Sequence, residues 1–292
     1  MQNAKSDARI TYLYLLIMLV VWAGMPFVSI AEEKALRPEL VFEPKEVGPG
    51  DILLVAVKNV AGPVEGTFIN RKVYFNPSKD SFKAVIGIDL YTEPGKYPLN
   101  ILVNGAPMRQ TITVHKKEYP IQRLTLPKDM VELSPENEAR VERERLKMAA
   151  IWPNESQRVW AGDFMNPLEG EIVTTFGVRR IINKIPKNPH SGMDVSGKEG
   201  DEVRAPNSGV VALVDDEFYS GNSLVLDHGQ GVYTMFFHLS KILVKPGQEV
   251  KKGDIIAHVG STGRSTGPHL HWGVRMQGAR VDPMELIKLK LE

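Results

Sequence analysis

The sequence predicts an all-β protein with two β domains joined by a helical connector. Short runs of β-branched and apolar residues, separated by turn residues, fill residues 32–125 and return after Phe164. Between them, residues 126–160 contain a long stretch without a helix breaker. The length of 292 residues agrees with about two domains at roughly 150 residues each. We therefore expect a β domain over 32–125, a connector over 126–160 and a second β domain over 161–292.

The first domain shows the pattern of a β-sandwich of immunoglobulin type. About seven short strands in fewer than 100 residues are typical of that fold. Asn104-Gly105 lies between two of the runs, and this dipeptide strongly favours a two-residue hairpin. The clearest expected strands are Asp51–Lys58, Ser81–Leu90, Tyr97–Val103 and Met108–His115.

The connector has the start signals of a helix. Ser134 is a favoured N-cap residue, and Pro135 suits the first helical position. Glu136 and Glu138 complement the positive end of the helix dipole. No breaker follows until Pro153, so we expect one helix with a solvated Glu/Arg face.

Glycines separate the expected strands of the second domain. This spacing predicts a second β-sheet domain. Its expected strands are Gly170–Phe176, Gly209–Val214, Ser223–Leu226, Val232–Phe237, Ile255–Val259 and Leu270–Arg275.

Composition excludes several classes of function. The chain has 36 Lys+Arg and 35 Asp+Glu, a net charge of +1, which disfavours binding to nucleic acid by counterion displacement. It has no cysteine, so thiol nucleophiles, iron–sulfur clusters, cysteine-type zinc sites and disulfides are excluded.

The first 31 residues resemble a secretory signal peptide. Lys5 and Arg9 precede Ile10–Ala31, a run of 22 residues without a charge. Small residues at Ser29 and Ala31 match the positions before a signal-peptidase cut. Because about 20 apolar residues can span a bilayer, an uncleaved anchor is the alternative, and this segment would then be the sole membrane attachment. Both interpretations place the rest of the chain outside the cytoplasm.

Two short motifs in the second domain predict a metal site. His190 and Asp194 form H-x-x-x-D, and His269 and His271 form H-x-H, while His238 ends an apolar run. Residues two or four apart in an extended strand share a face. Two imidazoles and one carboxylate suit catalytic zinc, which keeps a fourth position for water.

The surroundings of these motifs resemble the M23 family of zinc metallopeptidases, the lysostaphin/LytM-type peptidoglycan endopeptidases. The likeness covers Phe164 to Leu286. It rests on H-x-x-x-D, on the FxHL-type histidine His238, and on the run GSTGRSTGPHLHW, which ends at Trp272.

The resemblance implies a role for each residue. It makes His190, Asp194 and His271 ligands of one zinc ion and His238 and His269 the catalytic histidines, in a β-sheet domain with a narrow groove. It also implies an exported enzyme of the periplasm or cell envelope that hydrolyses cross-links between peptidoglycan stem peptides.

Other functions stay open at this stage. One alternative is a metal-free copy acting as a non-catalytic LytM-like activator of a murein amidase. Another is a peptidase for glycine-rich proteins or bridges. The N-terminal domain and the helix over 134–151 could also cover the groove until a cell-wall regulatory protein moves them. We expect His228 and His258 to be structural residues.

Overall fold

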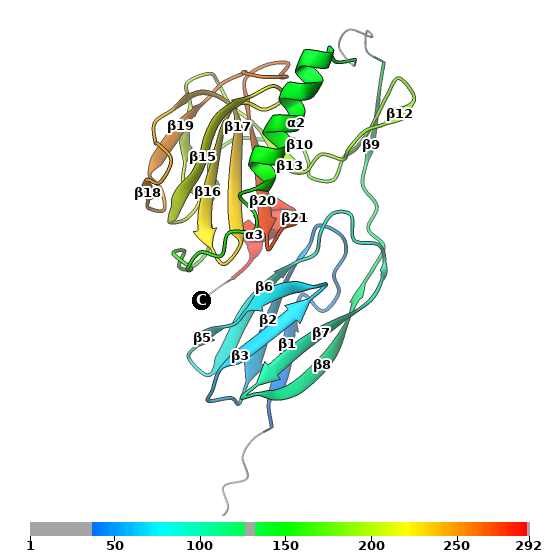
Figure 1. Ribbon diagram of the computed structural model, residues 1–292, viewed down its shortest axis with the longest axis vertical. Helices are drawn as coiled ribbons and strands as arrows, with labels where there is room; N and C mark the ends of the chain where they lie inside the picture. Colours follow the sequence, from blue (N-terminus) through cyan, green and yellow to red (C-terminus); the bar gives the residue numbers. More distant parts are fainter. Residues whose placement is uncertain (1–36, 126–131, 291–292) are drawn as a thin grey trace, which may run out of the picture. The chain divides into compact units, whose positions relative to one another are not determined.

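The structure, a computed structural model, describes residues 37–125 and 132–290 and is built mainly of β-strands (Figure 1). The all-β prediction is therefore confirmed. The predicted signal peptide over 1–31 lies outside the described residues. Within the described part of the chain, no helix is both long and apolar enough to cross a membrane.

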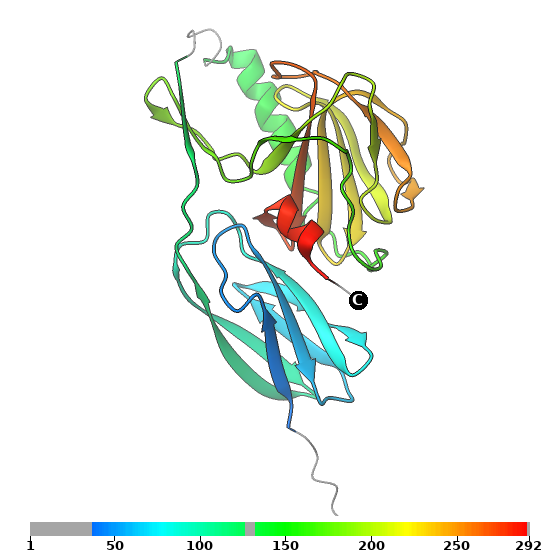
Figure 2. The ribbon, with the colours of Figure 1, turned by 180° about the vertical axis from the view of Figure 1, so that it is seen from behind.

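Residues 39–114 form a β-sandwich (Figure 2). One sheet has the strand order β1-β2-β6-β5 and the other β4-β3-β7-β8. Side chains of both sheets meet in a buried apolar cluster that includes Val55, Ile86, Leu99 and Ile101. The strands are β1 (Glu39–Glu43), β2 (Ile52–Lys58), β3 (Val64–Phe68), β4 (Arg71–Tyr74), β5 (Asn76–Ser78), β6 (Ser81–Gly87), β7 (Gly95–Val103) and β8 (Ala106–Val114).

The predicted hairpin joins β7 to β8. Asn104 has φ 51° and Gly105 has φ 79°. Both are in the left-handed region, as a two-residue turn between twisted strands requires. This confirms the interpretation of the Asn-Gly pair.

The second β region is built on a ten-stranded sheet, along which the main strand order is β10-β13-β20-β17-β16-β15-β18. Strand β19 pairs with β17 and β14, and β21 pairs with β20. Leu224, Phe236 and Trp272 are fully buried in its core. The strands are β10 (Ile172–Thr174), β13 (Gly192–Ser196), β14 (Glu202–Arg204), β15 (Gly209–Glu217), β16 (Gly221–Gly229), β17 (Val232–Ile242), β18 (Glu249–Val250), β19 (Ile255–Val259), β20 (His269–Met276) and β21 (Ala279–Val281).

A small three-stranded sheet ties the segment after the sandwich to the second region. Its strands are β9 (Ile121–Leu124), β11 (Arg179–Ile182) and β12 (Ile185–Pro186), with β9 parallel to β11. The sequence pattern did not predict this pairing, which joins segments almost 60 residues apart.

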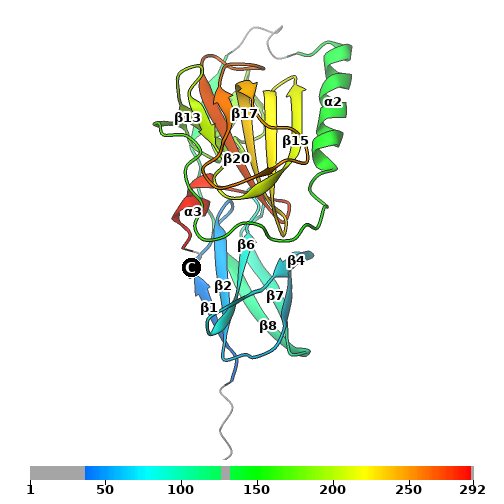
Figure 3. The same ribbon diagram turned by 90° about the vertical axis from the view of Figure 1, so that its left-hand side faces the viewer.

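The connector helix is α2 (Pro135–Ala149), and Ser134 caps it by accepting the backbone N–H of Asn137 at 3.3 Å. The helix lies beside β15 (Figure 3), where Lys147 Nζ is 2.6 Å from Asp215 Oδ2. None of its own residues is buried, in agreement with the predicted solvated face. A second helix, α3 (Pro283–Lys288), was not predicted, although Asp282 caps it.

The sandwich and the second region share apolar contacts. Ile52 and Val85 of the sandwich belong to the same buried cluster as Ala279 and Val281 of β21. At Gly87, an added Cβ would lie 2.9 Å from Val281 Cγ1, so only glycine permits this close packing without adjustment. The sandwich thus packs at β21, beyond the end of β20 distant from His269.

Candidate metal centre

Two neighbouring strands carry most of the predicted metal-binding residues. Strands β13 and β20 are antiparallel, and Asp194 pairs directly with His271. Side chains of directly opposite residues project from the same face of a sheet, so these two meet. His269 lies two residues before His271 and shares that face. His190 lies on the segment immediately before β13.

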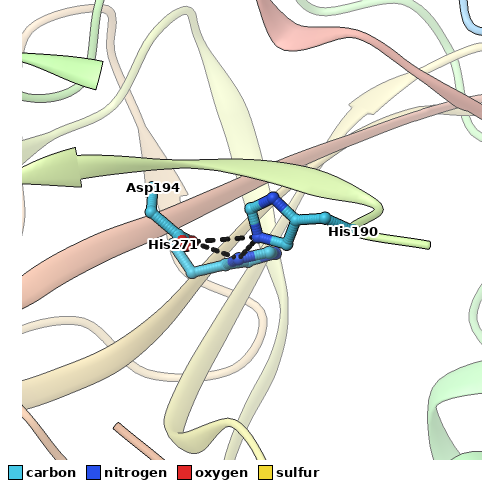
Figure 4. A group of neighbouring side chains, drawn as sticks. All are labelled: His190, Asp194 and His271. Carbon is cyan, nitrogen blue, oxygen red and sulfur yellow. Dashed lines mark hydrogen bonds and ion pairs between the residues drawn. The ribbon is translucent and has the colours of Figure 1, made fainter. Parts of the chain in front are cut away.

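The donor atoms of His190, Asp194 and His271, here called the His-Asp-His triad, converge on one point (Figure 4). His190 Nε2 is 3.0 Å from Asp194 Oδ1 and 2.9 Å from His271 Nδ1. His271 Nδ1 is 2.8 Å from the same carboxylate oxygen. All three residues are largely buried.

The orientation of His190 shows that this triad suits a cation. Its Nδ1 atom is 3.0 Å from the carbonyl oxygen of Thr175. A carbonyl can only accept, so Nδ1 carries the proton, and Nε2 of the neutral ring presents a lone pair to the triad. A lone pair, a second imidazole nitrogen and a carboxylate oxygen within 3.0 Å of each other repel unless a proton or metal ion lies among them. Two nitrogens and one oxygen are a donor set that fits zinc.

The protonation states also suit metal binding. Burial alone would raise the pKa of Asp194, but its contacts with His190 and His271 hold that pKa well below the ordinary value. Burial lowers the pKa of His271 to about 4, despite its contact with Asp194. At neutral pH the carboxylate is ionised and the His271 imidazole is neutral, which are the forms that bind metals.

His238 and His269, the predicted catalytic residues, lie beside the triad. Their ring centroids are 4.8 Å apart, and His269 Nε2 is 3.9 Å from Asp194 Oδ1. The Nδ1 atom of His238 donates to the carbonyl of Thr262, and that of His269 to the carbonyl of Gly267, each at 2.8 Å. In the neutral form of either ring, Nε2 therefore carries a lone pair and can accept a proton.

His238 occupies an unusual backbone conformation. Its φ is 61°, in the left-handed region that non-glycine residues seldom adopt. Strand β17 bulges here. Asn222 of β16 pairs with Leu239 and Leu224 pairs with Phe236, so two residues of β17 lie opposite one residue of β16. The neighbouring Phe237 ring stacks on His271 at a centroid distance of 5.3 Å. Burial lowers the pKa of His238, which favours its neutral form.

The structure supports the structural interpretation of His228. It is fully buried, with Nδ1 2.7 Å from the Ser208 carbonyl and Nε2 2.8 Å from Thr234 Oγ1. Burial lowers its pKa to about 4. His258 lies in β19, paired with Glu202 and Lys241 of the neighbouring strands, and is likewise outside the triad.

Sequence reasoning missed the groups that orient the histidines. These are mainly backbone carbonyls, at Thr175, Thr262 and Gly267, and no side-chain pattern marks a carbonyl. The importance of Gly192 could have been predicted from the sequence, because this glycine lies between the two residues of H-x-x-x-D. A Cβ there would lie 2.6 Å from His271 Nε2, so the close approach of β13 to β20 requires glycine.

Comparisons with known proteins match the part of the chain that carries these residues. Residues 188–283, which contain all five predicted site residues, match the model of peptidase family M23. A crystal structure of a putative peptidase M23 from Pseudomonas aeruginosa is 32% identical, with a TM-score of 0.69. The match covers 83% of this chain and 95% of that one.

Two curated relatives come from Vibrio cholerae serotype O1. Peptidoglycan DD-endopeptidase ShyA is 43% identical over 116 residues, or 39% of this chain and 27% of that protein. Peptidoglycan DD-endopeptidase ShyB is 45% identical over 97 residues, or 33% of this chain and 23% of that protein. The chain thus matches about a quarter of the length of these relatives.

The fold and the site together are those of a metallopeptidase. The likeness to the Pseudomonas structure extends through nearly all of that protein and most of this chain. The chain belongs to peptidase family M23.

Proposed function

We propose that this protein is an exported zinc endopeptidase that hydrolyses peptide cross-links of peptidoglycan. The observation that carries the proposal is the convergence of the His-Asp-His triad beside two further histidines, each with Nε2 available. The family and the names of the Vibrio relatives support peptidoglycan as the substrate.

In this proposal His190, Asp194 and His271 hold one zinc ion. When bound there, zinc would supply Lewis acidity to the scissile carbonyl and would lower the pKa of water. The carbonyl of Thr175 keeps the His190 ring in the tautomer that presents Nε2. Phe237 stacks on His271 and limits the rotation of its ring.

In this proposal His238 and His269 carry out the proton transfers of the reaction. Their Nδ1 atoms are committed to backbone carbonyls, so proton exchange occurs at Nε2. The pair accepts a proton from the attacking water and returns it to the leaving amine. Once protonated, these rings also stabilise the negative charge that develops on the scissile carbonyl.

We further propose that the chain works in the periplasm or cell envelope. The uncharged run Ile10–Ala31 supports export through a signal peptide over 1–31 or an anchor there. The β domain over 32–125 and the connector over 126–160 would then precede the peptidase domain over 161–292. Peptidoglycan itself is an envelope polymer, consistent with this location.

Muropeptide analysis tests the proposed activity. Purified murein sacculi are incubated with the zinc-loaded protein, with the protein in excess EDTA, and with the Asp194→Ala variant. We expect cross-linked dimers to decrease and monomers to increase only with the zinc-loaded wild type. Persistence of the dimers in all three samples would refute the endopeptidase proposal.

Metal analysis separates this proposal from the non-catalytic activator. Such activators typically lack zinc ligands, whereas the triad here is complete. We expect about one zinc per chain in protein purified without chelator. Protein without zinc that still stimulates a murein amidase would instead favour the activator. Regulation by a cell-wall protein that moves the N-terminal domain and the helix remains a prediction.

A further inference from the structure

We propose that α2 positions His238 by holding the end of β15 and the turn that follows it, residues 216–220, here called the loop, with Glu144 and Arg140 as the positioning residues. This inference rests on the proposed catalytic role of His238. It assigns the connector helix a part in the reaction, although α2 contributes no residue to the triad.

The first step is the contact between α2 and the loop. Glu144 Oε2 accepts the backbone N–H of Phe218 at 3.0 Å, and Arg140 Nη2 donates to the carbonyl of Asp216 at 2.9 Å. Arg140 Nε also donates to Glu144 Oε1 at 2.6 Å, which fixes the two side chains to each other. Hydrogen bonds with an ionised partner are about twice as strong as neutral ones. The Glu144 side chain is only 15% exposed, so water weakens its bond with Phe218 less than the bond of Arg140, which is 37% exposed, with Asp216.

The second step joins the loop to His238. The carbonyl of Ser220 accepts the backbone N–H of His238 at 2.8 Å. Gly221, with φ 62°, packs so closely on Thr262 that an added Cβ would lie 2.3 Å from its Oγ1. The carbonyl of Thr262 in turn accepts Nδ1 of His238. Ser220 of the loop therefore contacts the backbone of His238, and Gly221, the next residue, contacts the residue that orients its ring.

The third step is the backbone of His238 itself. A left-handed conformation at a non-glycine residue persists only when its surroundings hold it. Strand β17 also changes partner near this residue. It pairs with β20 up to Phe237 and with β19 from Leu239 onward. His238 thus lies between the β20 and β19 ladders of this edge, and on the opposite edge Ser220 accepts its backbone N–H. Loosening the loop should move Nε2 of His238 away from the triad.

The same helix contains a matched control. Glu142 and Arg145 form an ion pair at 2.7 Å, with side chains 56% and 61% exposed. Glu142→Ala removes a helical glutamate and its ion pair, as Glu144→Ala does, but leaves the contacts of Glu144 and Arg140 with the loop intact. A difference between these two variants therefore reports the contact with the loop rather than helix stability.

Two measurements on the full chain test the inference. The first is hydrogen exchange of zinc-free protein, followed in peptides that contain His238. We expect exchange of that segment to be at least about 10-fold faster in Glu144→Ala than in Glu142→Ala. The second is hydrolysis of sacculi, where Glu144→Ala should lower kcat by roughly 10-fold at nearly constant KM, as misplacement of a catalytic group does. Glu144→Gln, whose amide oxygen can still accept from Phe218 but not from Arg140 as well, should show smaller changes in exchange and kcat than Glu144→Ala.

The possible results distinguish the positioning role from the proposed function. Equal exchange at His238 in Glu144→Ala and Glu142→Ala would overturn the positioning role. Faster exchange with no hydrolysis by wild type would support positioning and refute the proposed function. If Glu144→Ala does not fold, Arg140→Gln decides, because it removes the contact with Asp216 and should also accelerate exchange at His238.

Discussion

Burial of His228 should make the stability of the folded chain depend on pH. The ring is fully buried, Phe164 packs edge-on against it at a centroid distance of 5.3 Å, and its Nδ1 already donates to Ser208. Protonation would place a positive charge in this fully buried setting, away from water. Burial accordingly lowers the pKa of His228 from 6.5 to about 4.

The size of the effect follows from that pKa difference. The unfolded chain binds the proton more tightly than the folded chain, so stability decreases as the pH falls below about 6.5. With a pKa of about 4 in the folded state, lowering the pH from 7 to 5 should cost about 2 kcal/mol. The full loss approaches about 3 kcal/mol near pH 4, and above pH 7.5 this residue contributes no slope.

Urea unfolding at several pH values measures this contribution. The comparison is between wild type and His228→Gln, both in EDTA, so that metal binding does not change with pH. The variant should be less stable at every pH, but its loss between pH 7 and 5 should be about 2 kcal/mol smaller. Other buried histidines, including His271, contribute equally to both proteins and cancel. Parallel pH dependences for the two proteins would refute the reasoning.

Three further predictions concern the site and its supports. Asp194→Ala should weaken zinc binding, measured by competition with a chelator. The loss should exceed the roughly 10–100-fold that is typical when a residue that only hydrogen-bonds to a metal ligand is replaced. Gly221→Ala should destabilise the fold by more than about 1 kcal/mol in urea, because φ is 62° and the added Cβ would meet Thr262; unchanged stability would contradict the tight packing. Burial raises the pKa of Glu217 from 4.5 to about 6, so the folded state favours the acid and loses stability as the pH rises from 4.5 to 6. Glu217→Gln should therefore gain about 2 kcal/mol at pH 7.5 and nothing below pH 4.5, and a gain that does not depend on pH would count against this assignment.

Sequence patterns predicted the elements that depend on interactions between residues close together in the chain. The Ser134-capped helix, the Asn104-Gly105 hairpin and the shared face of His269 and His271 each follow from a few adjacent residues. Turn chemistry and the two-residue period of a strand act within such short segments. The site could be proposed from sequence because its motifs are short and chemically demanding.

The remaining features depend on contacts between distant segments. The pairing of Asp194 with His271 spans 77 residues, and the register between two strands cannot be predicted from the sequence of either strand alone. The left-handed backbone of His238 arises from a bulge between β16 and β17. The role of Glu144 depends on where α2 lies, and a Glu/Arg run by itself predicts only a solvated face.

The parallel pair of β9 and β11 bears on how fragments of this protein will behave. Backbone N–H groups of Arg179 and Asn183 donate to the carbonyls of Pro120 and Leu124, each at 2.9 Å. A catalytic fragment that begins at Trp160 would lack β9 and leave this side of β11 as an open edge beside Ile181 and Ile182. Open edges with apolar side chains promote self-association. Low solubility of such a fragment would then reflect a missing strand and not a failure of the peptidase sheet to fold.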